Sequence, residues 1–125
     1  MPRYDTSIRP PAPFVDVLIL HPSRREQTRP IRGKLDSGAD ISVIPEEVAD
    51  ELRLIPAREI QARGYDGVAR DIQSYFVALE IEGCPIQLVE VIASHRADAL
   101  LGRDVLNRFK ITLDGKALAF EMTDP

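Results

Sequence analysis

Short apolar segments separated by turn signals constrain the fold of this chain more than any other feature of its sequence. The segments are rich in β-branched and aromatic residues, and Gly, Pro or Asp-Gly separates them. Asp66-Gly67 and Asp114-Gly115 are typical of tight hairpins, because both positions tolerate positive φ. Such a series predicts one compact all-β domain with a closed or nearly closed, barrel-like sheet. We expect strands at 14–20, 31–35, 41–44, 59–62, 68–82, 86–92, 110–113 and 116–122.

Two short helices are expected between these strands. Pro45 with two acidic residues after it is typical of a helix start, and Pro56 predicts an end near Leu54. A second helix is expected after Gly102. A brief apolar run precedes that glycine, and the Gly83-Cys84-Pro85 segment predicts another turn.

Composition and charge limit the possible partners. The 125 residues carry a net charge of −4 with no basic stripe, which argues against nucleic-acid binding. Residues 1–13 are rich in proline and predict an extended or mobile N-terminal arm, with one domain over 14–125. No signal-peptide pattern is present, and the apolar run at 14–20 is too short to span a bilayer. We therefore expect a soluble, cytoplasmic protein without a membrane partner.

The metal-binding residue types are sparse. Cys84 is the one cysteine, so no disulfide can form within the chain, and buried packing is the expected role of its side chain. His21 and His95 lie far apart and are expected at the surface. No Cys/His cluster and no His-Glu-x-x-His motif occurs, so no metal and no cofactor are expected.

Two segments carry chemistry. Asp36-Ser37-Gly38-Ala39 follows one apolar strand and precedes another, and Leu100-Leu101-Gly102-Arg103-Asp104 lies well downstream. Together they resemble the active-site turn and the start of the C-terminal helix in retropepsin-like (retroviral-type) aspartic proteases. The resemblance covers roughly residues 14–122. It implies a half-barrel with a flap hairpin and a short C-terminal helix.

The resemblance also implies a reaction. Aspartic proteases activate water between two carboxylates that share one proton, because two such close charges do not both ionise readily. Asp36, Ser37 and Gly38 would form the catalytic turn. The chain holds only one such motif, so the pair of aspartates requires a homodimer. The expected substrate is a polypeptide.

Further site residues follow from the same resemblance. The substrate would contact Ala39 and Asp40 on the turn, and the flap segment Gly64, Tyr65, Asp66 and Gly67. Arg103 would pair with Asp40 in a partly buried ion pair that ties the turn to the helix, and Asp104 would add structural support.

Several alternatives remain open on the sequence alone. Asp36 could be a turn carboxylate that caps nearby amides, and Arg103 and Asp40 could be unrelated surface charges. The protein could be a catalytically inactive dimerisation or peptide-binding module, since fold alone does not decide activity. It could also be an oligomerisation domain that uses the N-terminal arm as a tether.

Overall fold

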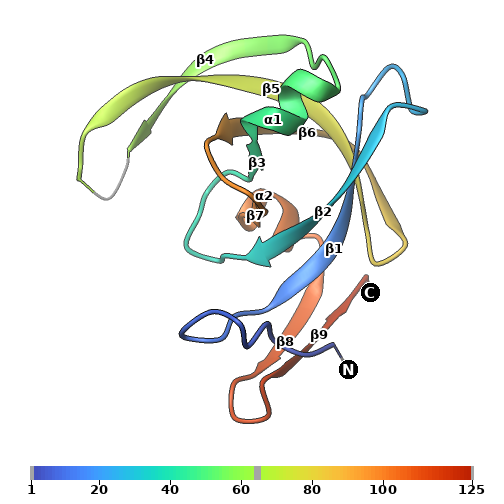
Figure 1. Ribbon diagram of the computed structural model, residues 1–125, viewed down its shortest axis with the longest axis vertical. Helices are drawn as coiled ribbons and strands as arrows, with labels where there is room; N and C mark the ends of the chain where they lie inside the picture. The colour runs from blue at the N-terminus through green and yellow to red at the C-terminus, as the bar shows by residue number, and fades with distance from the viewer. Residues whose placement is uncertain (1, 64–65, 125) are drawn as a thin grey trace.

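A computed structural model describes residues 2–63 and 66–124, and most of the chain forms one sheet that closes on itself (Figure 1). Seven strands follow the order β1-β2-β7-β3-β6-β5-β4, and β1 also pairs with β5. Six strands therefore form a ring, and β4 lies outside it. The elements are β1 (Phe14–Leu20), β2 (Thr28–Leu35), β3 (Val43–Pro45), α1 (Glu46–Glu51), β4 (Pro56–Arg63), β5 (Ala69–Ile81), β6 (Cys84–Ser94), β7 (Ala99–Leu101), α2 (Arg103–Leu106), β8 (Lys110–Asp114) and β9 (Ala119–Thr123).

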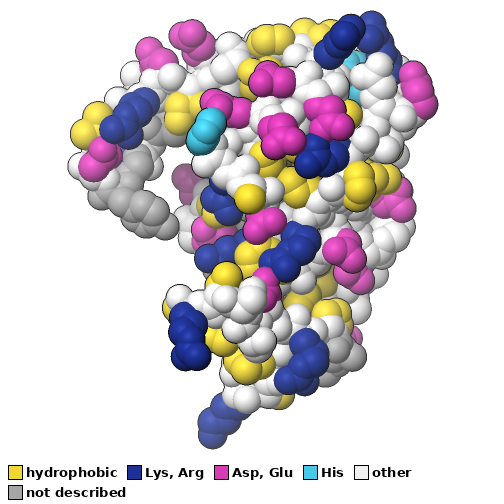
Figure 2. All heavy atoms as spheres, in the orientation of Figure 1, with side chains coloured by type: hydrophobic (Ala, Val, Ile, Leu, Met, Phe, Trp, Pro, Cys, Tyr) yellow, Lys and Arg dark blue, Asp and Glu magenta, His cyan; other side chains and the backbone are white. Residues whose placement is uncertain are grey.

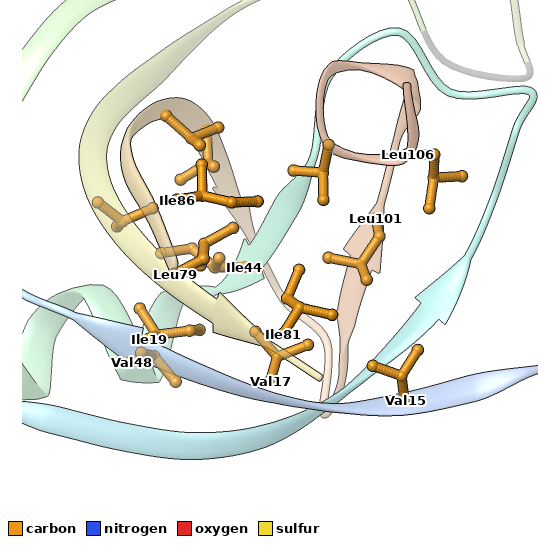
Figure 3. Packing of buried hydrophobic residues seen from close by; sticks show 14 of the residues in the cluster. Val15, Val17, Ile19, Ile44, Val48, Leu79, Ile81, Ile86, Leu101 and Leu106 are labelled. Carbon is orange, nitrogen blue, oxygen red and sulfur yellow. The ribbon is translucent and has the colours of Figure 1, made fainter. Parts of the chain in front are cut away.

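The core fills the inside of this ring. Alternate residues of β1 point inward, so Val15, Val17 and Ile19 are buried while Asp16 is exposed. Figure 3 shows these side chains together with Ile81 of β5 and residues of β7 and α2. The prediction of an all-β, barrel-like domain is confirmed.

The strand β5 takes part in two structures. From Ser74 onward it pairs with β6 and then also with β1 inside the ring, whereas residues 69–73 pair only with β4. The β4–β5 hairpin therefore extends away from the body, and β8 and β9 form a second hairpin at the opposite end (Figure 1). The predicted long hairpin is present, although β4 begins at Pro56, before the expected start.

Several element ends differ from the expectation. β2 begins at Thr28, because Thr28 to Pro30 pair with the end of β1. β3 begins only at Val43, and α1 ends at Glu51. The turn after β5 lies at Glu82 and Gly83, both with positive φ, so Cys84 already belongs to β6.

Residues 2–4 of the N-terminal arm lie against β9, and the arm then folds back on itself through an antiparallel bridge between Asp5 and Ala12. Arg3 forms an antiparallel bridge with Ala119, and the Tyr4 ring lies 6.2 Å from the ring of Phe120. Asp5 forms an ion pair with Arg32 of β2. The arm thus adds a third extended segment beside the β8–β9 hairpin.

The surface carries both signs of charge. Figure 2 shows acidic and basic side chains interspersed over the visible face. Within 2–63 and 66–124, no helix is long and apolar enough to cross a membrane.

Candidate active site

Asp36 stands at the end of β2, where the chain leaves the sheet and turns. Its backbone N–H donates to the Leu101 carbonyl of β7 at 2.9 Å, which holds the start of the turn against the sheet. The Gly38 N–H donates to Asp36 Oδ1 at 2.9 Å, and the Ala39 N–H donates to the Asp36 carbonyl at 3.2 Å. The Asp36 carboxylate is half-buried and oriented by a backbone amide.

The downstream motif packs directly against this turn. A Cβ atom added to Gly102 would lie 2.9 Å from the Ala39 carbonyl oxygen and 3.0 Å from backbone atoms of Ile41. The Arg103 N–H donates to the Ala39 carbonyl at 2.8 Å. Only glycine permits this close approach, so the sequence match at Gly102 has a steric cause.

Arg103 joins the same turn through its side chain. One guanidinium nitrogen pairs with the Asp40 carboxylate, and Nη1 donates to the Ser37 carbonyl at 2.7 Å. The expected pairing is therefore present, and these residues are not unrelated surface charges. The pair is buried mainly on the arginine side, because 45% of the Arg103 side chain and 85% of the Asp40 side chain are exposed in the single chain.

A buried network beneath the turn involves a residue that the sequence analysis did not single out. Ser42 is 2% exposed, and its Oγ donates to Asp104 Oδ1 at 2.7 Å. Asp104 Oδ2 accepts the Ser42 N–H at 3.0 Å, and Ser42 Oγ accepts the Gly102 N–H at 2.9 Å. Asp104 is therefore bonded to the segment that directly follows the turn. A serine within the apolar segment 41–44 was the signal that could have identified Ser42.

A groove of about 830 Å³ opens above the turn. The extended hairpin contributes one wall, and the hollow beneath it is visible in Figure 2. Most of the wall side chains are apolar, and Asp36, Asp40 and Arg63 bring charge to it. The lining residues are Asp36, Gly38, Ala39, Asp40, Ile41, Val43, Ile60, Gln61, Arg63, Ile92 and Leu100.

A half-buried carboxylate in a groove, beside an Asp-Ser-Gly turn tied to a Gly-Arg-Asp helix start, is the arrangement that the resemblance implied. Comparison with protein families agrees, since residues 26–108 match the family described as "gag-polyprotein putative aspartyl protease". The chain belongs to this family. The match includes both the turn and α2 and covers more than half of the chain.

Solved structures of aspartic proteases share the fold. A retropepsin-like aspartic protease from Rickettsia conorii is 18% identical over 86% of this chain and 79% of its own, with a TM-score of 0.59. The Simian Foamy Virus (mac) protease is 19% identical over 76% of this chain and 92% of its own, with a TM-score of 0.57.

EIAV protease, solved with the inhibitor HBY-793, is 26% identical over 77% of this chain and 86% of its own, with a TM-score of 0.51. A comparison with curated protein sequences gives no match. The retropepsin-like fold of this family member is thus shown, and its activity is treated below as a proposal.

Of the flap residues expected to contact substrate, Asp66 and Gly67 are described and lie shortly before β5. Gly64 and Tyr65 lie outside the described residues. Asp66 Oδ1 accepts the Val68 N–H at 3.0 Å and Oδ2 accepts from Arg70 at 2.9 Å, and these bonds lower the pKa of Asp66. Asp66 and Gly67 do not line the groove in the single chain, whereas Ile60, Gln61 and Arg63 of β4 do.

The histidines and the cysteine lie apart from the Asp36 turn, and none of them lines the groove. Among residues 2–63 and 66–124, no group of His, Cys, Asp and Glu could hold a metal ion. The expectation of a surface position for His21 was wrong, because His21 is buried and its Nδ1 accepts the Ser23 and Arg24 N–H groups. Cys84 is only half-buried and its Sγ lies 3.2 Å from Asp124 Oδ2, so it is not buried filler.

Proposed function

We propose that this protein is an aspartic endopeptidase, which hydrolyses peptide bonds as a homodimer with Asp36 from each copy in the catalytic pair. The observation that carries the proposal is the position of the Asp36 carboxylate. It lies in the groove of about 830 Å³, oriented by the Gly38 amide and held by the turn that Arg103 and Asp104 support.

The proposed reaction needs both carboxylates and one water molecule. One Asp36 carboxylate is ionised and takes a proton from water as the oxygen attacks the scissile carbonyl carbon. The other Asp36 is protonated and donates its hydrogen bond to the carbonyl oxygen. The two carboxyl groups share one proton, because two adjacent negative charges repel each other. The tetrahedral intermediate then collapses as the amide nitrogen receives a proton and leaves.

The other turn residues would position this pair. Gly38 donates its N–H to Asp36 and lacks a side chain that would obstruct the substrate. The Ser37 side chain is exposed in the single chain, where it is available to the turn of a second copy. Ser37 would thus fix the two carboxylates relative to each other.

The groove would hold an extended peptide. Ala39 and Asp40 offer backbone and side-chain contacts on the turn, and the flap segment 64–67 would close over the bound chain and exclude water. Backbone pairing would supply much of the recognition. The apolar wall residues Ile41, Ile60 and Leu100 favour apolar substrate side chains next to the cleaved bond.

Cleavage of casein between about pH 4 and 7 tests the proposal. Asp36→Asn keeps the size of the side chain and removes the carboxylate chemistry, and Asp16→Asn on the exposed face of β1 is the matched control. Wild type and Asp16→Asn should cut, and Asp36→Asn should lose activity while it remains folded and dimeric. Equal cutting by wild type and Asp36→Asn would overturn the proposal.

The second candidate is a catalytically inactive module that dimerises or binds peptides. It predicts that wild type fails to cut while a non-cleavable peptide still binds in the groove. The intact Asp36-Ser37-Gly38 turn favours the enzyme, because a binding module does not need a pair of carboxylates at its two-fold axis.

A further inference from the structure

The last residue of β4, Arg63, carries a positive charge on the wall of the groove. Asp36 and Asp40 are the other charged residues in the lining, and both are acidic. Arg63 is therefore the one basic residue among the described residues that line the groove. It is also exposed, so a bound peptide can reach it.

Arg63 differs from the other two arginines of the β4–β5 hairpin in its partners. Arg58 donates to both carboxylate oxygens of Glu90, at 2.7 and 2.9 Å, and Arg70 donates to Asp66 at 2.9 Å. Over residues 2–63 and 66–124, Arg63 has no carboxylate partner. Its charge is thus available to a ligand, whereas the charges of its two neighbours are already paired.

One hydrogen bond holds the Arg63 guanidinium in place. Its Nη1 donates to the Gly67 carbonyl at 2.9 Å, which joins the end of β4 to the segment before β5. A guanidinium has five N–H donors, and no other described residue accepts one of the remaining four. These donors form a planar fork that matches the two oxygens of a carboxylate. The group is therefore both oriented and free to bind an anion.

We propose that Arg63 determines substrate choice by binding an acidic side chain, Asp or Glu, of the peptide in the groove. The inference rests on the proposed function. In the homodimer a two-fold axis would relate the two copies, so one Arg63 would lie on each side of the cleaved bond. The substrate class is then a segment with apolar residues at the cleaved bond and an acidic residue nearby on one side or both.

The acidic residues of the groove do not cancel this positive charge. Asp40 already forms an ion pair with Arg103. Under the proposed mechanism the two Asp36 carboxyl groups share one proton, so the pair carries a single negative charge. Two Arg63 side chains would face that one charge in the dimer. A bound peptide would also displace water from the groove, which strengthens the attraction between its carboxylate and the guanidinium.

Matched peptides provide the test. Each peptide has the same apolar pair at the cleaved bond and carries Glu, Gln or Lys in turn at the second, third or fourth residue on either side. At the best position, wild type should cleave the Glu peptide with a kcat/KM about tenfold higher than that for the Gln peptide, and the Lys peptide should be the poorest. The difference should lie mainly in KM, because the ion pair forms when the peptide binds.

Variants of Arg63 separate recognition from a structural role. Arg63→Gln should lose the preference for Glu and still cleave the Gln peptide as wild type does, and Arg63→Glu should prefer the Lys peptide. Arg24→Glu makes the same change in net charge at an exposed loop outside the groove, so it is the matched control and should keep the wild-type preference. If Arg63→Gln slows all three peptides equally, Arg63 only supports the hairpin and the inference is overturned.

The pH dependence of the preference tests whether the recognised group is an ionised carboxylate. The side chain of a free peptide glutamate has a pKa of about 4.3, so the Glu peptide loses its negative charge below this pH. The ratio of kcat/KM for the Glu peptide to that for the Gln peptide should therefore fall toward one between about pH 6 and pH 3.5. A ratio that stays constant over this range would overturn the inference.

Binding measurements let the two proposals fail separately. The probes are fluorescent Glu and Gln peptides in which a reduced bond replaces the cleaved amide, and binding is measured by fluorescence anisotropy. Tighter binding of the Glu peptide that Arg63→Gln abolishes, without cleavage of any peptide, would leave the role of Arg63 standing and remove the protease. Equal cleavage of the Glu and Gln peptides by wild type would leave the protease standing and remove this inference. Neither binding nor cleavage would overturn both.

Discussion

The Asp104 carboxylate holds Ser42 by both its backbone N–H and its hydroxyl, although 62 positions separate the two residues in sequence. One oxygen accepts the hydroxyl at 2.7 Å and the other accepts the N–H at 3.0 Å. Ser42 Oγ in turn accepts the Gly102 N–H at 2.9 Å. The start of α2 and the strand after the turn are thus joined through one buried hydroxyl.

Ser42→Ala should destabilise the fold by about 1–3 kcal/mol, because the substitution leaves the buried Gly102 N–H without its acceptor. Urea unfolding of the variant measures this change. Ser42→Thr retains a hydroxyl and should lose less. Ser23→Ala, at an exposed loop position, is the matched control, and an equal effect at both sites would contradict the role given to Ser42.

Gly102→Ala should be destabilising by about 1–3 kcal/mol, because its methyl group would force the Ala39 and Ile41 backbone away from α2. The displaced turn carries Asp36, so activity should fall further than stability. Gly115→Ala is a clean comparison, since a Cβ there meets nothing within 4 Å. Gly102→Ala should therefore melt at a lower temperature and cleave casein more slowly than Gly115→Ala.

Arg103→Ala should lower stability by only about 1–2 kcal/mol, because the pair with Asp40 is largely exposed in the single chain. This is a smaller effect than a buried pair would give. Arg103→Lys keeps the positive charge, but a lysine lacks the planar guanidinium whose separate N–H groups bond the Ser37 carbonyl and the Asp40 carboxylate at the same time. Melting temperatures of both variants, with Arg24→Ala as control, measure the effect, and an unchanged melting temperature would contradict it.

Stability should depend on pH through Glu90. The hydrogen bonds from Arg58, with a further one from Ser74, lower the pKa of Glu90 from 4.5 to about 2. The Glu90 carboxyl therefore binds a proton more readily in the unfolded chain than in the folded chain. The stabilisation that ionised Glu90 contributes is present above pH 4.5 and is lost as the pH falls toward 2. Glu90→Gln should make the melting temperature depend less on pH between pH 4.5 and about 2. If the melting temperature changes with pH to the same extent in both proteins, Glu90 does not contribute.

Deletion of residues 1–12 should lower the melting temperature without separating the two copies. The arm covers the fully buried Phe120 through Tyr4 and pairs with β9, so its removal exposes apolar core. The Asp36 turn, where the two copies would meet, is bonded to β7 and α2 and not to residues 2–12. Sedimentation below the melting temperature should therefore still show a dimer, whereas a monomer would support the arm as a tether.

Local patterns predicted the elements that short-range rules determine. Strand β1 has the same bounds in the sequence analysis and in the structure, because its alternation reflects one buried face. Thr28 to Pro30 lacked such a pattern and belong to β2 only because β1 offers them a partner. His21 appeared to be an ordinary polar loop residue, and its burial depends on two amides of the following loop.

The candidate site divides in the same way. The Asp36 turn and the Gly102-Arg103-Asp104 segment are continuous in sequence, so their chemistry could be predicted. The groove walls come from β3, β4, β6 and β7, and only the closed sheet brings Ile60, Ile92 and Leu100 together. Ser42 needed its contact with Asp104, which no local spacing encodes.

The strand β5 belongs to both the ring and the extended hairpin, and this continuity has a mechanical consequence. The hairpin is a beam whose root is held between β1 and β6, and its described residues beyond this root pair only with each other. Bending of such a beam concentrates near the clamp, where the pairing of β4 and β5 is irregular between Pro56 and Glu59. Under the proposed function, peptide entry would be governed by the elasticity of one strand, and stiffening its root would slow turnover without touching the groove.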